Sequence, residues 1–522
     1  MYLTAGNVSL LYQDGSVRYI TANGREILRH IYVGIRDAEW NTAQNQIHNE
    51  QIKQEQNSFL IRYEWAAEEN GISMQGNVTI EGDSKGSIRF DWSGKALSTF
   101  MRNRIGICIL HPLDGFRGQV TELIHTDDRK SQNAFPELIS PEDPFLEIKG
   151  MQWQVDTKLT ATLQLSGEIF ETEDQRNWSD ASYKTFSTPK RLPIPVEVAA
   201  GTGFHQAASL VFTGDWAEPN EPIVRMEWSG EARSLPTWGV AWPATGQPTP
   251  EELTLLQKLK PAHLLVTGID TAYQSALAYA EPLNIPILLK LTLDQLPKIS
   301  LPSLVKEVLL IVKKDQQPDE TIAAFRSTYP ELKIGIGNTF ETFNQLDINY
   351  ELVDFVGFSL SPQIHQTDDL TLIENMAAQT DMVQTALVKT NKPVYITPIE
   401  FNIKPDPRLA TDLAAGWTLG SLKYAAAARS VTYYEAFGPK GIIQNGQPTP
   451  VYNVFAFLSE FQPDRIIPTR SSYPLKSTSL VLEKTDGWKT TLLVNHCNQA
   501  LAIRLPGGQT VTVEAMQWQA EY

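Results

Sequence analysis

The sequence predicts a multidomain protein that combines an N-terminal antiparallel β-sandwich, a central (β/α)8 TIM-like barrel and a small C-terminal β region. Three observations support this fold class. The chain has 522 residues, which is too long for one hydrophobic core and indicates two or three domains. Strand and turn patterns fill roughly the first 230 residues, and apolar runs then alternate with helical patterns over roughly 200 more. Strand patterns return near Tyr473.

The predicted N-terminal domain covers residues 1–232. Within residues 87–92, strict alternation puts Ile88, Phe90 and Trp92 on one face, which is the pattern of a strand with one buried side. Short turn signals such as Asp14-Gly15 interrupt the region repeatedly. These features favour an antiparallel sandwich.

The predicted barrel covers residues 233–465. Several of its strands are continuous apolar runs, as strands buried on both faces require. The strands are expected at Thr237–Trp242, His263–Ile269, Pro286–Leu291, Val308–Lys313, Lys333–Gly337, Phe355–Leu360, Val394–Pro398 and Val431–Glu435. Helices are expected at Pro250–Lys260, Thr271–Leu283, Asp319–Tyr329, Leu370–Thr390 and Arg408–Arg429. The connection after the third strand has the weakest helical pattern, because it contains Pro297 and Pro302.

The last predicted domain, residues 466–522, carries four strand patterns. They are Ser479–Lys484, Lys489–Asn495, Leu501–Leu505 and Thr510–Glu514. Some fifty residues of strands cannot build a large core alone, so we expect this region to pack against the barrel or to close a small sandwich.

Composition excludes several function classes. The net charge is −16 without a basic cluster, which argues against nucleic acid and anionic membranes as partners. No run approaches the roughly 18 apolar residues of a membrane span, and the N-terminal residues lack a secretory signal. Cys108 and Cys497 lie far apart in apolar settings, which favours buried thiols. We expect a cytoplasmic protein without a cofactor whose partner is a small molecule; the oligomeric state is open.

The segment Gly167–Thr185 carries the densest chemistry. It mixes carboxylates, cations, amides and a tryptophan, without regular periodicity after Phe170. Carboxylates and amides bind hydroxyls in pairs and an indole covers an apolar sugar face, so the inventory is typical of carbohydrate sites. A charged hairpin with internal Arg–Glu pairs is an equal alternative.

Barrel enzymes place their chemistry at the C-terminal ends of the strands. The candidates there are Trp242, Gln363, His365, Asp368, Asp369, Glu400, Tyr434 and Glu435. A histidine titrates near neutrality, and we expect Asp368 or Asp369 to orient His365, although either can instead cap the next helix. Glu435 has a structural alternative as a buried carboxylate hydrogen-bonded by Tyr433 or Tyr434.

Two other chemistries are less favoured. A retaining glycosidase would use Glu400 as its nucleophile, but it also needs an acid Glu after the fourth strand, where Lys313-Lys314-Asp315 stands. A metal on His365, Asp368 and Asp369 is not favoured, because no His-x-His or His-Glu-x-x-His spacing exists. No Gly-x-Ser-x-Gly elbow indicates an acyl-enzyme serine.

Six sequence words carry a family resemblance. They are GICILHP at 106–112, FPELISP at 135–141, FETEDQRNWSDASYKT at 170–185, SPQIH at 361–365, WTLGSL at 417–422 and YYE at 433–435. In this order the chain resembles the D-apionate lactonase family, enzymes that open the lactone of a branched-chain sugar acid. Two segments depart from the family pattern. Phe401–Pro405 stands where an Arg- and Asn-rich segment is usual, and Asp347 stands where an Arg is expected.

The resemblance implies a mutarotase-like sandwich and the hydrolysis of D-apionolactone or a related aldonolactone. We expect His365 or Glu435 to activate water, and Glu173 or Asp174 to donate a proton if burial raises its pKa. Arg176 would stabilise the oxyanion. Glu400 is a further catalytic candidate, and the other expected substrate contacts are Asn177, Trp178, Asp180, Lys184, Trp242, Gln363, Asp368 and Tyr434. A glycoside hydrolase acting on a plant-derived oligosaccharide and a non-catalytic carbohydrate-binding protein are the alternatives.

Overall fold

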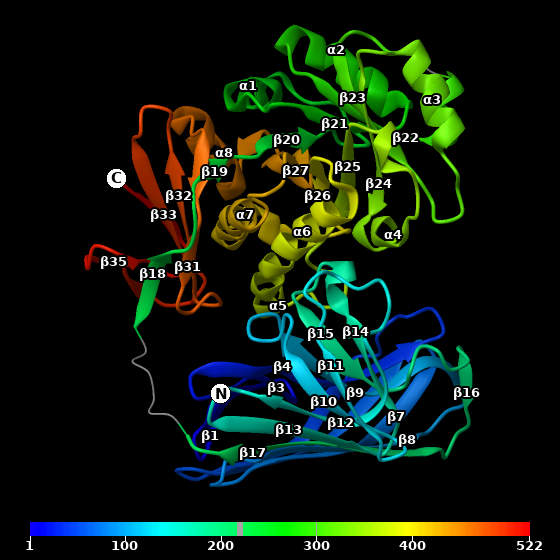
Figure 1. The fold of residues 1–522 in the computed structure, drawn as a ribbon, viewed down its shortest axis with the longest axis vertical. Helices are drawn as coiled ribbons and strands as arrows, with labels where there is room; N and C mark the ends of the chain where they lie inside the picture. The colour runs from blue at the N-terminus through cyan, green and yellow to red at the C-terminus, as the bar shows by residue number, and fades with distance from the viewer. Residues whose placement is uncertain (217–222, 299) are drawn as a thin grey trace. The chain divides into compact units, whose positions relative to one another are not determined.

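The protein is described here by a computed structural model that covers residues 1–216, 223–298 and 300–522 (Figure 1). The described chain divides into two compact units. The first comprises Met1–Gln175 and Ser182–Glu221, and the second comprises Arg176–Ala181 and Pro222–Tyr522. The short segment 176–181 therefore belongs with the second unit although both its flanks belong to the first. The boundaries at residues 232 and 465 stay predictions.

The first unit is built on antiparallel strands, as predicted. Within residues 1–216 these are β1 (Tyr2–Ala5), β2 (Val8–Gln13), β3 (Ser16–Ala22), β4 (Arg25–Asp37), β5 (Gln46–Gln54), β6 (Phe59–Glu69), β7 (Ile72–Gly82), β8 (Ile88–Ala96), β9 (Phe100–Pro112), β10 (Val120–His125), β11 (Lys130–Ala134), β12 (Phe145–Gln154), β13 (Leu159–Ser166), β14 (Phe170–Asp174), β15 (Ser182–Phe186), β16 (Val196–Val198) and β17 (Gly203–Gly214). The predicted alternation in β8 is confirmed, because Ile88, Phe90 and Trp92 are all buried. Trp92 stacks on Trp65 of β6 in this core.

The second unit contains the predicted barrel. Among the described residues, the barrel strands are β20 (Thr237–Ala241), β21 (Leu264–Thr267), β22 (Ile287–Thr292), β23 (Val305–Ile311), β24 (Lys333–Thr339), β25 (Phe355–Leu360), β26 (Val394–Ile399) and β27 (Ser430–Phe437). Each pairs in parallel with the next, and β27 pairs in parallel with β20, which closes the barrel. All eight predicted strands are confirmed, with ends that shift by up to three residues. The hairpin of β28 (Gly441–Gln444) and β29 (Gln447–Pro448) follows β27.

Helices cover the barrel between its strands. They are α1 (Pro250–Leu259), α2 (Thr271–Leu283), α3 (Asp319–Thr328), α4 (Phe340–Gln345), α5 (Asp369–Glu374), α6 (Ala378–Thr390), α7 (Asp412–Tyr424) and α8 (Pro450–Phe461) in the described part of the chain. Short 3-10 turns are η1 (Gln175–Trp178), η2 (Leu293–Lys298), η3 (Tyr350–Leu352), η4 (Asn375–Ala377) and η5 (Pro407–Ala410). The weak helical pattern after the third strand corresponds to η2. The pattern at 370–390 corresponds to α5, η4 and α6 in succession.

The start of α1 illustrates why these segments become helical. Thr249 precedes Pro250 and accepts a hydrogen bond from the backbone nitrogen of Glu252, whose carboxylate in turn accepts one from the Thr249 nitrogen. This reciprocal cap satisfies two amides that an isolated helix end leaves without partners. No helix in the described residues is long and apolar enough to cross a membrane.

The C-terminal strands form two small sheets in the second unit. One contains β18 (Val224–Trp228), β31 (Thr469–Ser471), β34 (Leu501–Arg504) and β35 (Thr510–Val513). The other contains β19 (Arg233–Ser234), β30 (Arg465–Ile467), β32 (Ser477–Glu483), β33 (Lys489–Asn495) and β36 (Trp518–Glu521). Side chains of both sheets share one core, which includes Met226, Val481 and Val513. The strands just before the barrel thus pair with strands that follow it.

Candidate functional site

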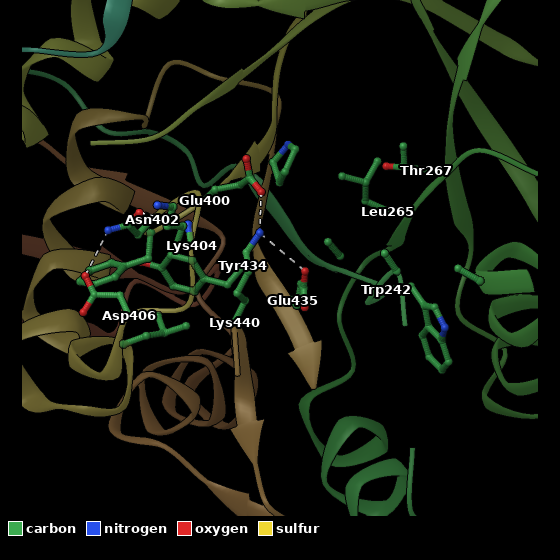
Figure 2. A pocket seen from close by; sticks show the side chains of 16 residues that line it. Trp242, Leu265, Thr267, Glu400, Asn402, Lys404, Asp406, Tyr434, Glu435 and Lys440 are labelled. Atoms are coloured by element: carbon green, nitrogen blue, oxygen red, sulfur yellow. Dashed lines mark hydrogen bonds and ion pairs between the residues drawn. The ribbon is translucent and has the colours of Figure 1, made fainter. Parts of the chain in front are cut away.

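A cavity of about 240 Å³ lies at the C-terminal ends of the barrel strands (Figure 2). Its walls come from the ends of β20, β21, β26 and β27, which are neighbours in the barrel. This end carries the chemistry in barrel enzymes, and a concavity with a few converging polar groups is the usual small-molecule site. The lining residues are Ala241, Trp242, Ala244, Leu265, Thr267, Ala272, Pro398, Glu400, Phe401, Asn402, Lys404, Asp406, Leu409, Tyr434, Glu435 and Lys440.

Trp242, Glu400, Tyr434 and Glu435 are the predicted site residues that line this cavity. They meet because each stands at or just beyond the C-terminal end of its strand. Lys440 lies there too, and sequence reasoning missed it. Its position a few residues beyond Glu435, in the turn after β27, was the only available signal.

Lys440 links the two cavity glutamates. Its Nζ donates to Oε1 of Glu400 at 2.8 Å and lies 3.8 Å from Oε1 of Glu435 (Figure 2). The backbone nitrogen of Glu435 donates to the carbonyl of Lys440 at 3.2 Å, which holds the turn and the ammonium in place. Burial raises the pKa of Glu435; the charge of Lys440 lowers it and that of Glu400 raises it further. Glu435 is therefore a stronger proton acceptor, once ionised, than an exposed glutamate.

Tyr434 and Trp242 serve as walls of the cavity. The Tyr434 hydroxyl lies 2.8 Å from Oγ1 of Thr418, and the Tyr433 hydroxyl lies 3.1 Å from Oγ of Ser421. The alternative in which either tyrosine hydrogen-bonds Glu435 is therefore wrong, because both hydroxyls are directed to α7. The indole of Trp242 stacks against Tyr279, with ring centroids 5.9 Å apart.

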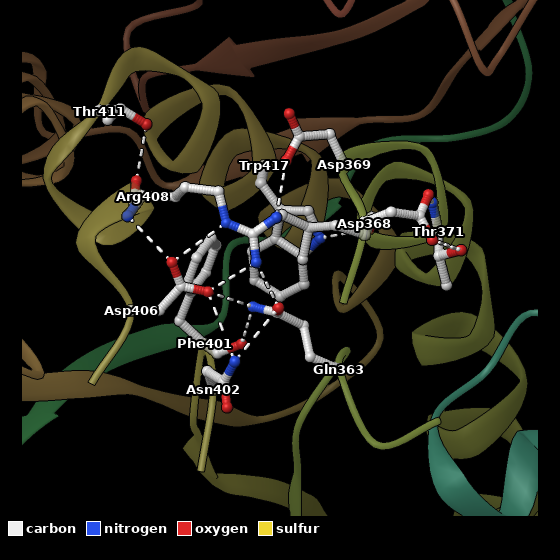
Figure 3. Close-up of polar contacts among 11 residues, drawn as sticks. Gln363, Asp368, Asp369, Thr371, Phe401, Asn402, Asp406, Arg408, Thr411 and Trp417 are labelled. Carbon is white, nitrogen blue, oxygen red and sulfur yellow. Dashed lines mark hydrogen bonds and ion pairs between the residues drawn. The ribbon is translucent and has the colours of Figure 1, made fainter. Parts of the chain in front are cut away.

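Gln363 is tied to the loop that follows β26 (Figure 3). Its Nε2 donates to the carbonyl of Phe401 at 2.7 Å and to Oδ2 of Asp406 at 3.2 Å. Arg408 donates to Oε1 of Gln363 and to Oδ2 of Asp406, at 2.6 Å each. Although burial opposes it, hydrogen bonding by Arg408 lowers the pKa of Asp406 to about 2. This ionised network fixes the segment from Phe401 to Asp406, which lines the cavity, so Gln363 shapes the wall of the site.

The carboxylate that orients His365 is not one of the two expected. Asp368 caps α5 by accepting from the Thr371 nitrogen at 3.0 Å, and Asp369 accepts from Arg408 at 2.6 Å. The partner is Asp180, whose Oδ2 lies 2.5 Å from Nδ1 of His365. The orienting role predicted for Asp368 or Asp369 is therefore wrong, and the capping alternative holds for Asp368.

Asp180 and His365 form a held pair. Nδ2 of Asn375 donates to the other oxygen of Asp180 at 3.0 Å, and the Trp178 indole meets the His365 ring edge-on with centroids 5.8 Å apart. The His365 side chain keeps 24% of its surface exposed. A histidine held at Nδ1 by a carboxylate has a defined tautomer, which suits proton transfer at Nε2.

Arg176 and Asn177 are engaged with other side chains of the second unit. Nη1 of Arg176 donates to Oδ2 of Asp381 at 2.7 Å, and the Arg176 side chain is 0% exposed. Nδ2 of Asn344 donates to Oδ1 of Asn177 at 2.9 Å. These contacts anchor segment 176–181 and leave no exposed guanidinium surface at Arg176 for a substrate.

Glu173, Asp174 and Lys184 lie buried in the first unit. Glu173 lies 2.8 Å from Nζ of Lys190, 3.2 Å from Nζ of Lys184 and 3.8 Å from Arg104. Burial alone raises the pKa of Glu173, but these three cations together hold it well below its usual value. Proton donation by Glu173 was expected only if burial raised its pKa. The pKa is lowered instead, so this prediction is wrong for Glu173. Asp174 accepts a hydrogen bond from the Ser140 nitrogen at 3.1 Å.

The part of the chain that the structure describes contains no cluster of metal-binding side chains and two free cysteines. No three His, Cys, Asp or Glu side chains there gather closely enough to hold a metal ion. Cys108 is buried, Cys497 is partly buried, and both are free thiols.

Comparison with known proteins gives family matches to most of the chain. The model described as "D-apionate lactonase, N-terminal domain" matches residues 1–215, and that described as "D-apionate lactonase, TIM barrel domain" matches residues 312–405 and 402–463. The D-apionate lactonase of Brucella anthropi is 29% identical over 449 residues, which are 78% of this chain and 73% of that protein.

Solved structures show weaker likeness. A GH51 arabinofuranosidase from Xanthomonas axonopodis pv. citri has 11% identity and a TM-score of 0.41, covering 55% of this chain and 88% of its own. The bifunctional glucanase-xylanase CelM2 from a metagenome library has 8% identity and a TM-score of 0.41, covering 58% of this chain and 99% of its own.

Proposed function

Because this chain belongs to the D-apionate lactonase family, we propose that it hydrolyses the lactone of a sugar acid, D-apionolactone or a close relative, to the open aldonate. The observation that carries the proposal is the Glu400–Lys440–Glu435 cluster in the barrel cavity. It joins a carboxylate of raised pKa to a second carboxylate and an ammonium, in a space suited to a small polyhydroxylated ring.

In the proposed mechanism Glu435 is the general base. Its carboxylate takes a proton from a water molecule as the water oxygen attacks the lactone carbonyl carbon. The resulting tetrahedral oxyanion collapses, the ring C–O bond breaks, and the leaving alkoxide takes the proton back from Glu435. One water is consumed and one aldonate is released after the acid ionises. Lys440 keeps Glu435 ionised between turnovers, because its charge opposes the effect of burial.

The charges of the cavity fit a neutral substrate. The carboxylates of Glu400 and Glu435 share Lys440, and Asp406 is paired with Arg408. A lactone carries no charge until it opens, so it enters without the desolvation of an ion. Asn402 also lines the cavity and can bind a hydroxyl.

The proposal is tested by pH-stat measurement of acid release from a panel of small aldonolactones that includes D-apionolactone. We expect one branched lactone to be opened fast and enantioselectively, well above the rates for the unbranched members. Equal slow rates on every lactone, no faster than with heat-denatured protein, would overturn it.

His365 is the second candidate for the base, on account of its pairing with Asp180. Since neither His365 nor its contacts Asp180 and Trp178 line the cavity, we expect His365→Ala to lower kcat by no more than about tenfold. Steady-state kinetics on the best lactone of the panel measure this. A loss of about a hundredfold or more in kcat, shared by Asp180→Asn, would transfer the base role to His365.

Glycosidase chemistry with Glu400 as the nucleophile is the alternative function to be tested. That chemistry needs two carboxylates about 5 Å apart, one of them protonated. Two observations weigh against it: β23 is followed by Val312, Lys313 and Lys314, and Lys440 donates to Glu400. Release of a chromogenic aglycone from aryl glycosides, lost in Glu400→Gln, would favour the glycosidase. Stabilisation by sugars without turnover on any substrate would favour a binding protein.

A further inference from the structure

Lys290 lies in the third barrel strand; it is not itself part of the cavity lining, but its side chain is on the same face of the sheet as residues that are. It pairs with Thr267 of β21 and Leu309 of β23. Residues paired across parallel strands point to the same face, and Thr267 lines the cavity. Leu288, two residues earlier in β22, packs in one cluster with Leu265 and Leu309, and Leu265 also lines the cavity. Lys290 thus stands two residues beyond Leu288 on the same face, level with Thr267 and Leu309.

The ammonium of Lys290 differs from the other cations around the cavity, which are either paired with carboxylates or, like Lys404, exposed to solvent. Lys440 is paired with Glu400 and Glu435, and Arg408 is paired with Asp406. Among residues 1–216, 223–298 and 300–522, Nζ of Lys290 has neither a hydrogen bond nor an ion pair. Burial lowers the pKa of Lys290, and the attraction of Glu400 partly offsets this. A partly buried charge without a paired anion is unfavourable, so such an arrangement suits an anion that arrives with a ligand.

We propose that Lys290 is the cation that stabilises the oxyanion formed from the lactone carbonyl and then binds the carboxylate of the product. The ammonium donates a hydrogen bond to the oxygen on which negative charge develops, and this interaction strengthens as the neutral carbonyl becomes anionic. Lys440 is less suited to the task, because two carboxylates already neutralise it. The inference rests on the proposed lactonase function. It adds to that function Lys290 as the group that binds the negative charge of the oxyanion and of the carboxylate product.

The test compares Lys290→Met with Lys290→Arg and with a matched control, Lys423→Met. Lys423 lies on α7, where burial lowers its pKa to about 8, and it contacts the Tyr424 ring away from the cavity lining. We expect Lys290→Met to lower kcat/KM by about a hundredfold and to weaken inhibition by the aldonate product by at least about tenfold. Lys290→Arg should keep part of the kcat/KM and part of the product inhibition. Lys423→Met should change neither quantity by more than about threefold.

Two further readouts separate this role from a structural one. Removing a partly buried charge that has no ion pair should leave the Tm of Lys290→Met unchanged or raise it by about 2 °C, so the loss of activity cannot come from unfolding. Added methylammonium should restore part of the activity of Lys290→Met and none to Glu435→Gln. An active wild type with Lys290→Met turnover and aldonate inhibition both within threefold would overturn the inference and leave the lactonase proposal intact.

An inactive wild type would overturn the lactonase proposal instead, and Lys290 is then tested by binding alone. Calorimetric titration with small aldonates should give binding to the wild type that Lys290→Met loses and Lys423→Met keeps. Equal binding, or equal absence of binding, in the wild type and Lys290→Met would overturn the anion site as well.

Discussion

Glu435→Gln is expected to lower kcat on the preferred lactone by about a thousandfold while KM changes by less than about threefold. The amide is nearly isosteric with the carboxylate and can occupy the same space, but it cannot accept a proton from water. General-base catalysis contributes about 10²–10⁴ in rate, so the loss should fall on the chemical step rather than on binding. Initial-rate kinetics at saturating lactone measure it.

A matched control for this variant is Glu460→Gln, which removes an exposed carboxylate at the end of α8. It should retain wild-type kcat. The thermal unfolding of Glu435→Gln should show no destabilisation, because its charge is not needed by a buried structural partner other than Lys440. A kcat within tenfold of wild type would remove Glu435 from the base role.

The pH profile adds a second check on Glu435. A general base must be ionised, so kcat/KM should fall as the pH drops through the pKa of Glu435. Burial raises that pKa, so the acid limb should lie above the pH at which an ordinary exposed glutamate titrates. Lys440→Met removes a charge that lowers this pKa, and the limb should therefore move to still higher pH. If the acid limb of the Lys440→Met variant stays at the wild-type pH, the limb reports the titration of a group other than Glu435.

The fold was accessible from sequence because the barrel repeats one local pattern. Each buried parallel strand is an apolar run bounded by turns, and this pattern predicted all eight strands. The same regularity indicated which side chains gather at one end of the barrel. Residues at the C-terminal ends of strands meet in any closed barrel, so Trp242, Glu400, Tyr434 and Glu435 could be grouped without coordinates.

Contacts made by side chains far apart in the chain could not be predicted in this way. Asp180 and His365 are 185 residues apart, and the nearby Asp368 and Asp369 offered a local explanation that proved wrong. Glu173 shows the same limit for charge. Its pKa depends on Arg104, Lys184 and Lys190, which reach it from other parts of the first unit, and their sum reverses the effect of burial.

Lys290 illustrates a third limit. A lone lysine in an apolar strand has no sequence pattern that distinguishes a solvated side chain from one directed into the barrel. Only the pairing with Thr267 and Leu309 decides the face. Residues whose function depends on register therefore become visible only after the strands are aligned.

Arg176→Met is expected to destabilise the second unit by about 3–5 kcal/mol, the largest stability effect that we predict. The guanidinium is wholly buried against Asp381, so the substitution removes the cation beside a carboxylate whose side chain is only 9% exposed. Breaking one half of a buried ion pair costs this much because the remaining charge loses its counter-ion and does not regain its water. Denaturant unfolding, read as the free energy of the transition of the second unit, measures the loss.

Two comparisons identify the buried charge as the cause. The double variant Arg176→Met with Asp381→Leu removes both charges and should recover most of the lost free energy, since apolar pairs often replace buried ion pairs without penalty. The matched control is Arg326→Met, which breaks the Arg326–Asp354 pair of 2.8 Å on the surface, where both side chains are at least a third exposed. Such pairs contribute about 0.2–1 kcal/mol. A different outcome would contradict this role. If Arg176→Met lowers the free energy of unfolding no more than Arg326→Met does but abolishes lactone turnover, Arg176 acts on the substrate, as the sequence first indicated. The buried pair with Asp381 would then not be its main role.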